Sequence, residues 1–231
     1  MSEYHIEAFK KAIEAGAKTV MINSGLINGV PVHADYNLMI NVLRNKLGFE
    51  GVILTDWEDI RKLHDFAQKY KAPVWVAMEY RYMPVLQEFI QQEKSVTGGV
   101  KMLTIREHRF PFLKIVGNWN RFNEKTGGTF VEKCCHFFDL MRLVIKSEPT
   151  RVMATAGQDV NHLDERYNGQ VPDILDKGYV LVDFKKGARA MLEGWKFGEG
   201  AMYLEEISAD GPKGKLETKV PGPGRFWPKE L

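Results

Sequence analysis

The chain is organised around an apolar stretch that runs from residue 129 to residue 144 and predicts a buried helix. The apolar positions in this stretch are Phe130, Val131, Cys134, Cys135, Phe137, Phe138, Leu140, Met141, Leu143 and Val144. A helix that is apolar on nearly all sides must be mostly buried. Thr129 and Glu132 form a T-x-x-E capping box directly after two glycines. This box predicts that the helix begins here.

A narrow polar stripe interrupts the apolar surface of this helix. At about 100° per residue, Glu132, His136 and Asp139 fall within an arc of roughly 60°. Lys133 and Arg142 flank the arc on either side. The stripe is either the solvated face of the helix or a row of polar groups that points into a pocket, and the pattern alone leaves both interpretations open.

The first third of the chain alternates helical spacing with short apolar runs. Helices are predicted near residues 5–15, 35–47 and 58–70, and strands near residues 19–22, 52–55 and 73–78. Short strands that are apolar throughout and are joined by helices are typical of a parallel sheet covered on both faces. The sequence therefore predicts an α/β fragment built of parallel β/α units.

Asp56 is the best-placed carboxylate of this region, because it directly follows the apolar run V-I-L-T. Functional groups collect at the carboxyl ends of strands in parallel sheets. An aspartate at this position can also cap the N-terminus of the next helix, and spacing alone favours the cap. We predict that Asp56 lies at the carboxyl end of a parallel strand.

The remaining two thirds of the chain have a different pattern. After a helix near residues 84–94, strands are predicted near residues 100–107, 151–156, 178–184, 188–194, 204–209 and 214–220. Together with the apolar helix they predict an α+β domain, in which helices cover a largely antiparallel sheet. The other face of such a sheet must also be covered, which suits a homo-oligomer formed through the sheet.

Composition excludes some classes of partner. The chain has 231 residues, of which 44% are hydrophobic and 27% charged, and its formal net charge is +2. These values are ordinary for a globular protein and give no reason to expect nucleic acid as a partner. No apolar run approaches the length of a membrane span, and the charged N-terminus lacks a signal-peptide core. We expect a cytoplasmic protein without a membrane partner.

The two cysteines, Cys134 and Cys135, are adjacent in the predicted helix. Neighbouring helical residues point in different directions, so a disulfide between them is not expected. Two buried free thiols suit a reducing compartment. No further Cys or His lies at ligand spacing from the pair, so we predict no metal site.

The segment G-G-T-F-V-E-K-C-C-H-F-F-D-L-M resembles the acid-x-x-x-His helix in the second domain of Gfo/Idh/MocA-type sugar oxidoreductases. By this resemblance His136 is the general acid/base and Glu132 is the acidic residue four positions before it, where the family more often has Asp. The resemblance covers about residues 69–231 and includes K-A-P-V-W-V-A-M-E-Y-R-Y-M-P. It implies an NAD(P)-dependent enzyme that acts on a sugar or polyol.

The same resemblance places several side chains at substrate-pocket positions. They are Tyr80, Arg81, Trp119, Asn120 and Arg121. Asp139 joins them as a candidate through its place on the polar stripe. We therefore expect the stripe to face residues 119–121.

Two motifs of this family are missing from the sequence. No G-x-G-x-x-G occurs, so the turn that normally holds the dinucleotide diphosphate is absent. The family's E-K-P segment, whose lysine assists proton transfer, is absent as well. We therefore expect the chain to be incomplete as an oxidoreductase.

Residues 4–63 resemble a different family, the late barrel strands of glycoside hydrolase family 3. The segments that carry this resemblance are A-F-K-K-A-I-E-A-G-A-K-T-V-M-I-N-S-G-L-I-N-G-V-P-V-H-A and V-L-R-N-K-L-G-F-E-G-V-I-L-T-D-W-E-D-I. By this resemblance Asp56 is the catalytic nucleophile. A retaining glycosidase needs a second carboxyl group about 5 Å away. Glu58 and Asp59 follow Asp56 too closely to face it, which leaves Glu79 as a remote candidate.

The sequence thus predicts a hybrid chain, a chimera with a glycosidase-type fragment at residues 1–68 and an oxidoreductase-type substrate domain at residues 69–231. The leading functional hypothesis is an oxidoreductase-type domain for a sugar or polyol. The alternatives are a glycoside hydrolase fragment of the β-glucosidase type and a non-catalytic or dimerising module.

Overall fold

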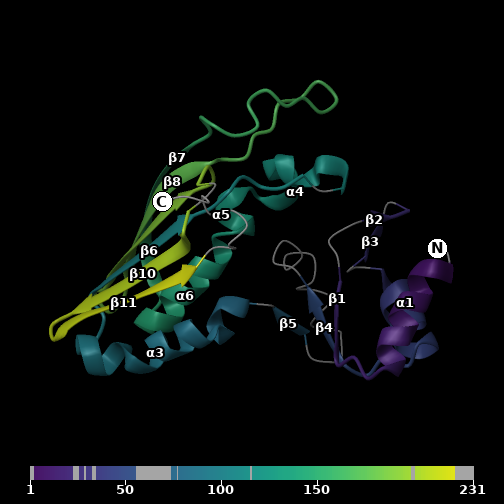
Figure 1. The fold of residues 1–231 in the computed structure, drawn as a ribbon, viewed down its shortest axis with the longest axis horizontal. Helices are drawn as coiled ribbons and strands as arrows, with labels where there is room; N and C mark the ends of the chain where they lie inside the picture. The colour runs from purple at the N-terminus through teal and green to yellow at the C-terminus, as the bar shows by residue number, and fades with distance from the viewer. Residues whose placement is uncertain are drawn as a thin grey trace. The chain divides into compact units, whose positions relative to one another are not determined.

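The computed structural model of the protein describes residues 3–22, 26–28, 30–32, 35–55, 74–76, 78–114, 116–198 and 201–221. The chain forms two compact units, Met1–Ala77 (unit 1) and Met78–Leu231 (unit 2). Figure 1 shows the elements of both units. The domain boundary predicted between residues 68 and 69 lies outside the described residues.

Unit 1 contains a three-stranded parallel sheet in the order β1-β4-β5. Its strands are β1 (Thr19–Met21), β4 (Val52–Thr55) and β5 (Val74–Val76), beside a two-residue antiparallel pair of β2 (Leu26–Ile27) and β3 (Val30–Pro31). The helices are α1 (Glu3–Glu14) and the π-helix η2 (Asn37–Lys46). The parallel pairing of β1 with β4 and of β4 with β5 is the arrangement that the apolar runs predict.

A small core and two hydrogen bonds from the Arg44 side chain hold η2 against the segment that leads into β4. The buried apolar side chains of this core are Ile22, Met39, Leu43, Phe49 and Ile53. Arg44 donates from Nη1 to the carbonyl oxygens of Phe49 at 2.7 Å and Gly51 at 2.8 Å. At the other end of η2, the Asp35 carboxylate accepts the backbone N–H of Asn37 at 2.9 Å. This contact satisfies a backbone donor at the start of η2, close to residue 35, where the sequence predicts that the helix begins.

Unit 2 is built on a six-stranded sheet in the order β11-β10-β6-β9-β8-β7. Its strands are β6 (Met102–His108), β7 (Pro149–Gly157), β8 (Lys177–Phe184), β9 (Arg189–Trp195), β10 (Tyr203–Gly211) and β11 (Gly214–Pro221). Neighbouring strands are antiparallel except for β6 and β9, which are parallel. The predicted α+β architecture with a largely antiparallel sheet is confirmed.

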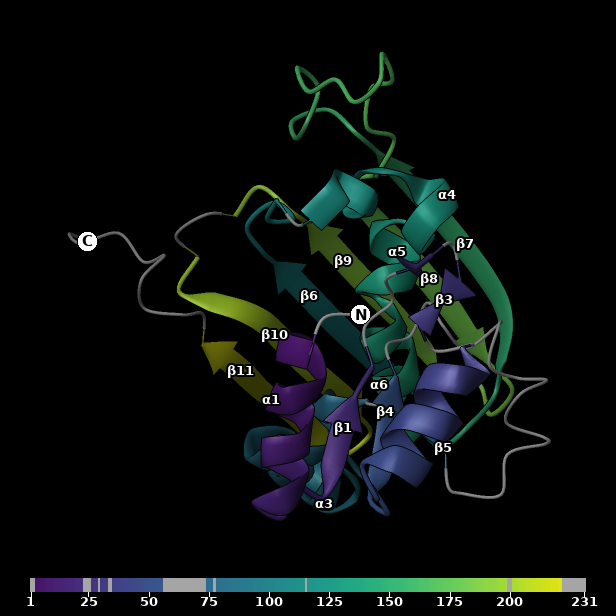
Figure 2. The ribbon, with the colours of Figure 1, turned by 90° about the vertical axis from the view of Figure 1, so that its right-hand side faces the viewer.

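Helices cover one face of this sheet (Figure 2). They are α3 (Pro84–Thr97), α5 (Thr129–Glu132) and α6 (Cys135–Ile145), with the short helices η4 (Glu79–Tyr82), η5 (Val116–Arg121) and α4 (Asn123–Thr126) nearby in the chain. Burial alternates along β6, β8 and β9, as expected for a sheet covered on one side, whereas the edge strand β7 is exposed along almost its whole length. On β8, Val180 and Val182 are buried in the core, whereas Tyr179 and Leu181 on the opposite face are exposed.

The core of unit 2 lies between α3, α6 and the sheet. Its most buried large side chains include Leu86, Leu103, Ile105, Phe137, Leu140, Met141, Leu192 and Ile207. Pro84 occupies the first turn of α3, and Gly98 ends the helix in the left-handed conformation at φ 74°. These are the residue types that these two helix positions favour.

The predicted helix over residues 129–144 is broken into two pieces. Helix α5 ends at Glu132, residues 133 and 134 form a turn, and α6 begins at Cys135. The predicted capping box is wrong, because Gly128 is the N-cap residue and no side chain caps the helix. The Thr129 hydroxyl donates instead to the backbone carbonyl of Leu175, before β8. A contact with a distant segment has therefore displaced the local cap.

The two cysteines agree with the sequence expectation. Cys134 and Cys135 are buried free thiols, and burial raises the pKa of Cys134. Among the described helices, none is long and apolar enough to cross a membrane.

Candidate functional site

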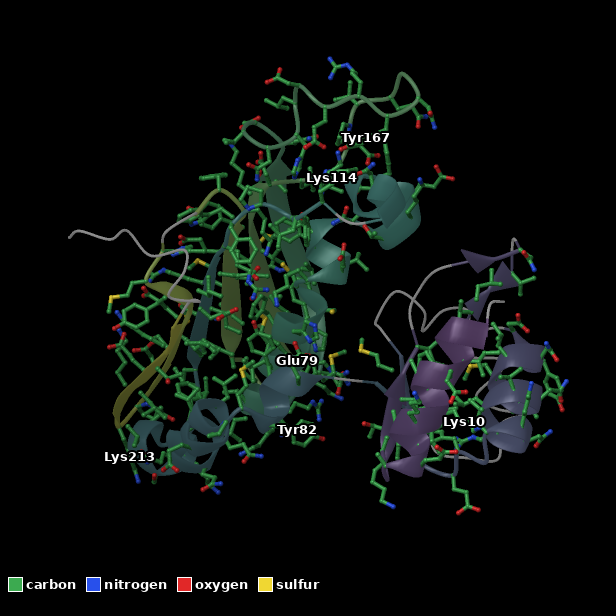
Figure 3. The ribbon with its side chains drawn as sticks, turned by 45° about the vertical axis from the view of Figure 1, so that its right-hand side comes forward. Lys10, Glu79, Tyr82, Lys114, Tyr167 and Lys213 are labelled. Atoms are coloured by element: carbon green, nitrogen blue, oxygen red, sulfur yellow. The ribbon has the colours of Figure 1, made fainter. Side chains whose placement is uncertain are left out.

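His136 lies at the first turn of α6 and faces η4. Its Nδ1 is 3.4 Å from Glu79 Oε2, and its side chain is 13% exposed compared with 53% for Glu79. The rings of His136 and Tyr80 pack at a centroid distance of 5.5 Å. Figure 3 labels Glu79 and Tyr82, the first and last residues of η4. An imidazole that is mostly buried beside a more exposed carboxylate is a suitable proton-transfer group.

Asp139 lies one turn along α6 from His136 and binds Arg81 of η4. Arg81 Nε is 2.5 Å from one carboxylate oxygen of Asp139, and a second guanidinium nitrogen reaches the other oxygen at 2.5 Å. The hydrogen bond to Asp139 raises the pKa of Arg81. This bidentate pair fixes η4 against α6. The charged groups of Arg81 and Asp139 are therefore paired with each other.

The structure describes the surroundings of the other two candidates on these elements, Glu132 and Tyr80. Glu132 belongs to α5, so the break after it removes the continuous helix that would place it one turn before His136. Tyr80 is only 4% exposed, and its hydroxyl binds Glu205 and Lys133. Tyr80 is therefore a buried neighbour of His136.

The expectation that the polar stripe faces residues 119–121 stays a prediction, because the structure does not describe every side chain involved. The described ion-pair partners of His136 and Asp139 come from η4. Arg121 is buried and pairs with Glu165 at 2.8 Å. Asn120 donates to the carbonyl of Leu113 at 3.0 Å, and the Trp119 side chain lies outside what the structure describes. The local sequence pattern could not show that His136 and Asp139 pair with η4, because η4 is distant from α6 in the sequence.

Arg121 belongs to a polar network with the long segment between β7 and β8. Glu165 accepts hydrogen bonds from Arg121 at 2.8 Å and Tyr167 at 2.7 Å, and it lies 2.9 Å from His162 Nδ1. Tyr167 is labelled on this segment in Figure 3. Burial raises the pKa of Glu165, but the hydrogen bonds from Tyr167, His162 and Arg121 outweigh it and bring the pKa to about 2.

Because of this network, part of the free energy of unfolding of unit 2 is lost at low pH. The folded-state pKa of Glu165 lies below its unfolded value, so its contribution is present above pH of about 4.5 and is lost as the pH falls towards 2. We expect this loss to be on the order of 1 kcal/mol, after discounting for solvent screening. Glu165→Gln should flatten the acid dependence of urea unfolding, whereas Glu124→Gln at an exposed site should leave it unchanged. Equal acid dependence in all three proteins would contradict this assignment.

Asp56, the candidate nucleophile, lies outside the described residues. Strand β4, which ends at Thr55 directly before it, is parallel to both of its neighbours. Glu79, the remote candidate for a second carboxyl group, belongs to unit 2 and pairs there with His136. Glu79 thus acquires a role that the sequence did not suggest.

The described residues do not fit a bound dinucleotide. Its diphosphate needs a glycine-rich turn that leads from a strand directly into a helix N-terminus. After β1 the chain passes through the β2–β3 pair before η2 begins, and no G-x-G-x-x-G occurs in the sequence. Among the described residues, no cluster of His, Cys, Asp or Glu could hold a metal ion.

Comparison with known families assigns the larger part of the chain. Residues 93–223 match the model of the oxidoreductase family, C-terminal alpha/beta domain, which is the Gfo/Idh/MocA family. The chain belongs to this oxidoreductase family. Unit 2 is accordingly an oxidoreductase-type domain, and the resemblance predicted from the histidine helix is confirmed.

The N-terminal part of the chain matches the model of a second family. Residues 1–79 match the model of the glycosyl hydrolase family 3 N-terminal domain. The lysosomal beta glucosidase of Dictyostelium discoideum is 53% identical over 64 residues, which are 27% of this chain and 8% of the glucosidase. The chain thus spans a small part of that relative's length. The predicted hybrid of two families is confirmed.

Solved structures show the same fold over most of the chain. A probable dehydrogenase from Thermotoga maritima has a TM-score of 0.64 at 15% identity, covering 93% of this chain and 60% of that chain. The myo-inositol dehydrogenase from Lactobacillus casei, determined with NAD(H) and myo-inositol, has a TM-score of 0.59 at 14% identity and covers 94% and 58%. At such identities the likeness concerns the fold alone.

Proposed function

We propose that unit 2 is the substrate domain of an oxidoreductase that acts on a sugar or polyol, with His136 as its proton-transfer residue. The observation that carries this proposal is the pairing of His136 Nδ1 with Glu79 at 3.4 Å. A carboxylate beside one ring nitrogen orients the imidazole and favours the tautomer with its proton on that side. The lone pair of the other nitrogen, Nε2, can then accept the proton of a substrate hydroxyl.

The substrate class is supported by the relatives of this domain. Oxidation of an alcohol requires removal of the hydroxyl proton as hydride leaves the carbon, and His136 can accept that proton. A structural relative was determined with NAD(H) and myo-inositol. By family resemblance the cofactor of this type of oxidoreductase is NAD(P).

The domain limits and the assembly belong to the same proposal. Residues 1–68 derive from the glycosidase family and residues 69–231 from the oxidoreductase family. The sheet of unit 2 exposes apolar side chains on the face opposite its helices, among them Tyr179 and Leu181. A second copy of this chain covering that face would form a homo-oligomer through the sheet.

A second candidate function rests on the glycosidase match. The 53% identity to the lysosomal beta glucosidase supports Asp56 as a retained nucleophile position. Cleavage with retention needs two carboxyl groups about 5 Å apart. Glu79, the remaining carboxylate candidate, lies beside His136. The oxidoreductase-type reading is therefore the better supported of the two.

We expect weak binding of myo-inositol to the full chain, and we expect His136→Ala to reduce it about fivefold. One hydrogen bond to a ligand hydroxyl contributes about 1 kcal/mol, which corresponds to nearly that factor. Ligand-observed NMR titration with myo-inositol and with glucose measures the effect. His108→Ala is the matched control, because His108 binds Glu193 on the opposite face of the sheet. Equal affinity in both variants, or no binding at all, would contradict the proposed site.

A further inference from the structure

Two glutamates lie side by side in the interior of unit 2. Glu107 of β6 and Glu205 of β10 are register partners in the antiparallel pair, and they are 0% and 1% exposed. Register partners point to the same face of a sheet, and this face is the one that the helices cover. Carboxylates are rarely so deeply buried unless they are paired. We therefore expect both glutamates to have polar partners inside unit 2.

Each glutamate has its own partner. Glu107 Oε2 binds Lys196 Nζ at 2.5 Å, and both side chains are almost completely buried. Glu205 Oε1 accepts a short hydrogen bond from the hydroxyl of Tyr80 in η4. The sheet is thus linked through Glu205 to the short helix that carries Glu79.

Lys133 also contacts the Tyr80 hydroxyl that binds Glu205. Its Nζ lies 3.2 Å from the Tyr80 hydroxyl, and it stands over the rings of Tyr80 at 5.0 Å and Phe137 at 5.8 Å. Lys133 occupies the turn between α5 and α6. The turn between the two helices therefore carries a partly buried lysine that contacts Tyr80 and Phe137.

These contacts leave the Tyr80 hydroxyl with two partners. Burial raises the pKa of Tyr80, and the adjacent Glu205 raises it further, so the phenol keeps its proton and donates to Glu205. Burial lowers the pKa of Lys133. The phenol oxygen can then accept from Lys133 while its proton points to Glu205, which fixes the tilt and position of the ring.

We propose that Glu205, Tyr80 and Lys133 form a positioning network that holds the Tyr80 ring against His136 and so orients the imidazole towards Glu79. The Tyr80 and His136 rings are in contact, at 5.5 Å between centroids and 34° between planes. A fixed Tyr80 ring therefore restricts the orientation of the His136 ring. None of the three need touch the substrate. The functional meaning of this network rests on the proposed role of His136, but its geometry can be tested without any ligand.

The test is the NMR signature of the His136 ring in the full chain. In Tyr80→Phe, which keeps the ring and removes the hydroxyl, we expect the ring proton resonances of His136 to shift by more than their linewidth or to broaden by exchange. Lys133→Met should give a change at the same resonances. Tyr179→Phe is the matched control, because this tyrosine is 52% exposed on the other face of the sheet.

A purely structural role would give a different result. Thermal melting would then fall in Tyr80→Phe and Lys133→Met while the His136 resonances stayed at their wild-type positions, and that outcome would overturn the proposal. Tyr80→Phe leaves the buried Glu205 without its donor, so the double variant Tyr80→Phe/Glu205→Gln repeats the test without that charge. Its His136 resonances should be displaced as in the single variant.

The outcome is separable from that of the polyol-binding experiment. Displaced His136 resonances without any polyol binding would contradict the proposed function and leave the positioning network intact. Polyol binding that depends on His136, with His136 resonances unaffected by Tyr80→Phe, would support the proposed function and contradict the positioning network.

Discussion

Replacing Lys196 by methionine is expected to lower the free energy of unfolding of unit 2 by about 3–5 kcal/mol. Lys196 Nζ binds Glu107 at 2.5 Å, and neither side chain is exposed by more than 3%. Methionine fills similar space but leaves the Glu107 carboxylate buried without its cation. The nearest remaining cation, Arg109, lies 3.8 Å from the other carboxylate oxygen. A loss of this size is a large part of the stability of an ordinary domain.

Chemical unfolding followed by circular dichroism measures this effect. Lys219→Met is the matched control, because Lys219 is half exposed and lies 3.9 Å from Glu206, so its loss should cost less than about 1 kcal/mol. The double variant Glu107→Leu/Lys196→Met should recover most of the stability, since it removes both charges together. If Lys196→Met were as stable as Lys219→Met, the buried ion pair would not exist as the structure shows it.

The 231-residue chain is expected to turn over neither substrate class at an enzyme-like rate. Hydride transfer requires a nicotinamide held against the substrate carbon, and the described residues do not fit its diphosphate. Glycoside cleavage requires a second carboxyl group opposite Asp56, and Glu79 is paired with His136 instead. Correct placement of reacting groups contributes on the order of 7–11 kcal/mol to catalysis. Losing half of either site forfeits most of that contribution.

Two assays test this expectation with the full chain. NADH formation from myo-inositol is followed beside His136→Ala, and chromophore release from an aryl glucoside is followed beside Asp56→Asn. We expect no rate above that of the paired variant in either assay. Turnover that depends on His136 would establish a working oxidoreductase. Hydrolysis abolished by Asp56→Asn would favour the glycosidase hypothesis.

The sheet of unit 2 could be predicted because its signal is local and repeated. Alternation of buried and exposed residues along β8 and β9 follows the two-residue period of a strand. The apolar runs before Asp56 and at residues 74–76 likewise indicate strands without any knowledge of their neighbours. In each case the side chains of one strand carry the information that places it.

The helix break at residues 133 and 134 could not be predicted in this way. The apolar pattern from Phe130 to Val144 continues across the turn, and nothing in it marks an interruption. The helix start predicted at Thr129 agrees with α5, but the predicted capping hydrogen bond is absent, and the Thr129 hydroxyl binds Leu175, which lies far along the chain. Tertiary contacts overrode the local preference, as they commonly do for helix ends.

The candidate site shows the same limit. His136 stands out in the sequence because it sits on a polar stripe of an apolar helix, but Glu79 belongs to a short 3-10 helix that carries no periodic signal. The buried pair of Glu107 and Glu205 is harder still to foresee. Glutamates in strands normally point to solvent, so their pattern reads as two exposed positions. Only the register between β6 and β10 brings them together.

The parallel pairing of β6 with β9 also bears on how unit 2 folds. Met102 pairs with Arg189, and the chain between them includes η5, α4, α5, α6, β7 and β8. Closing so long a loop costs entropy before the central strands of the sheet can gain their contacts. The β10–β11 hairpin, by contrast, closes through a short turn. We therefore expect the hairpin to form early and the centre of the sheet late, with β6 exposed to mispairing until β9 has been synthesised.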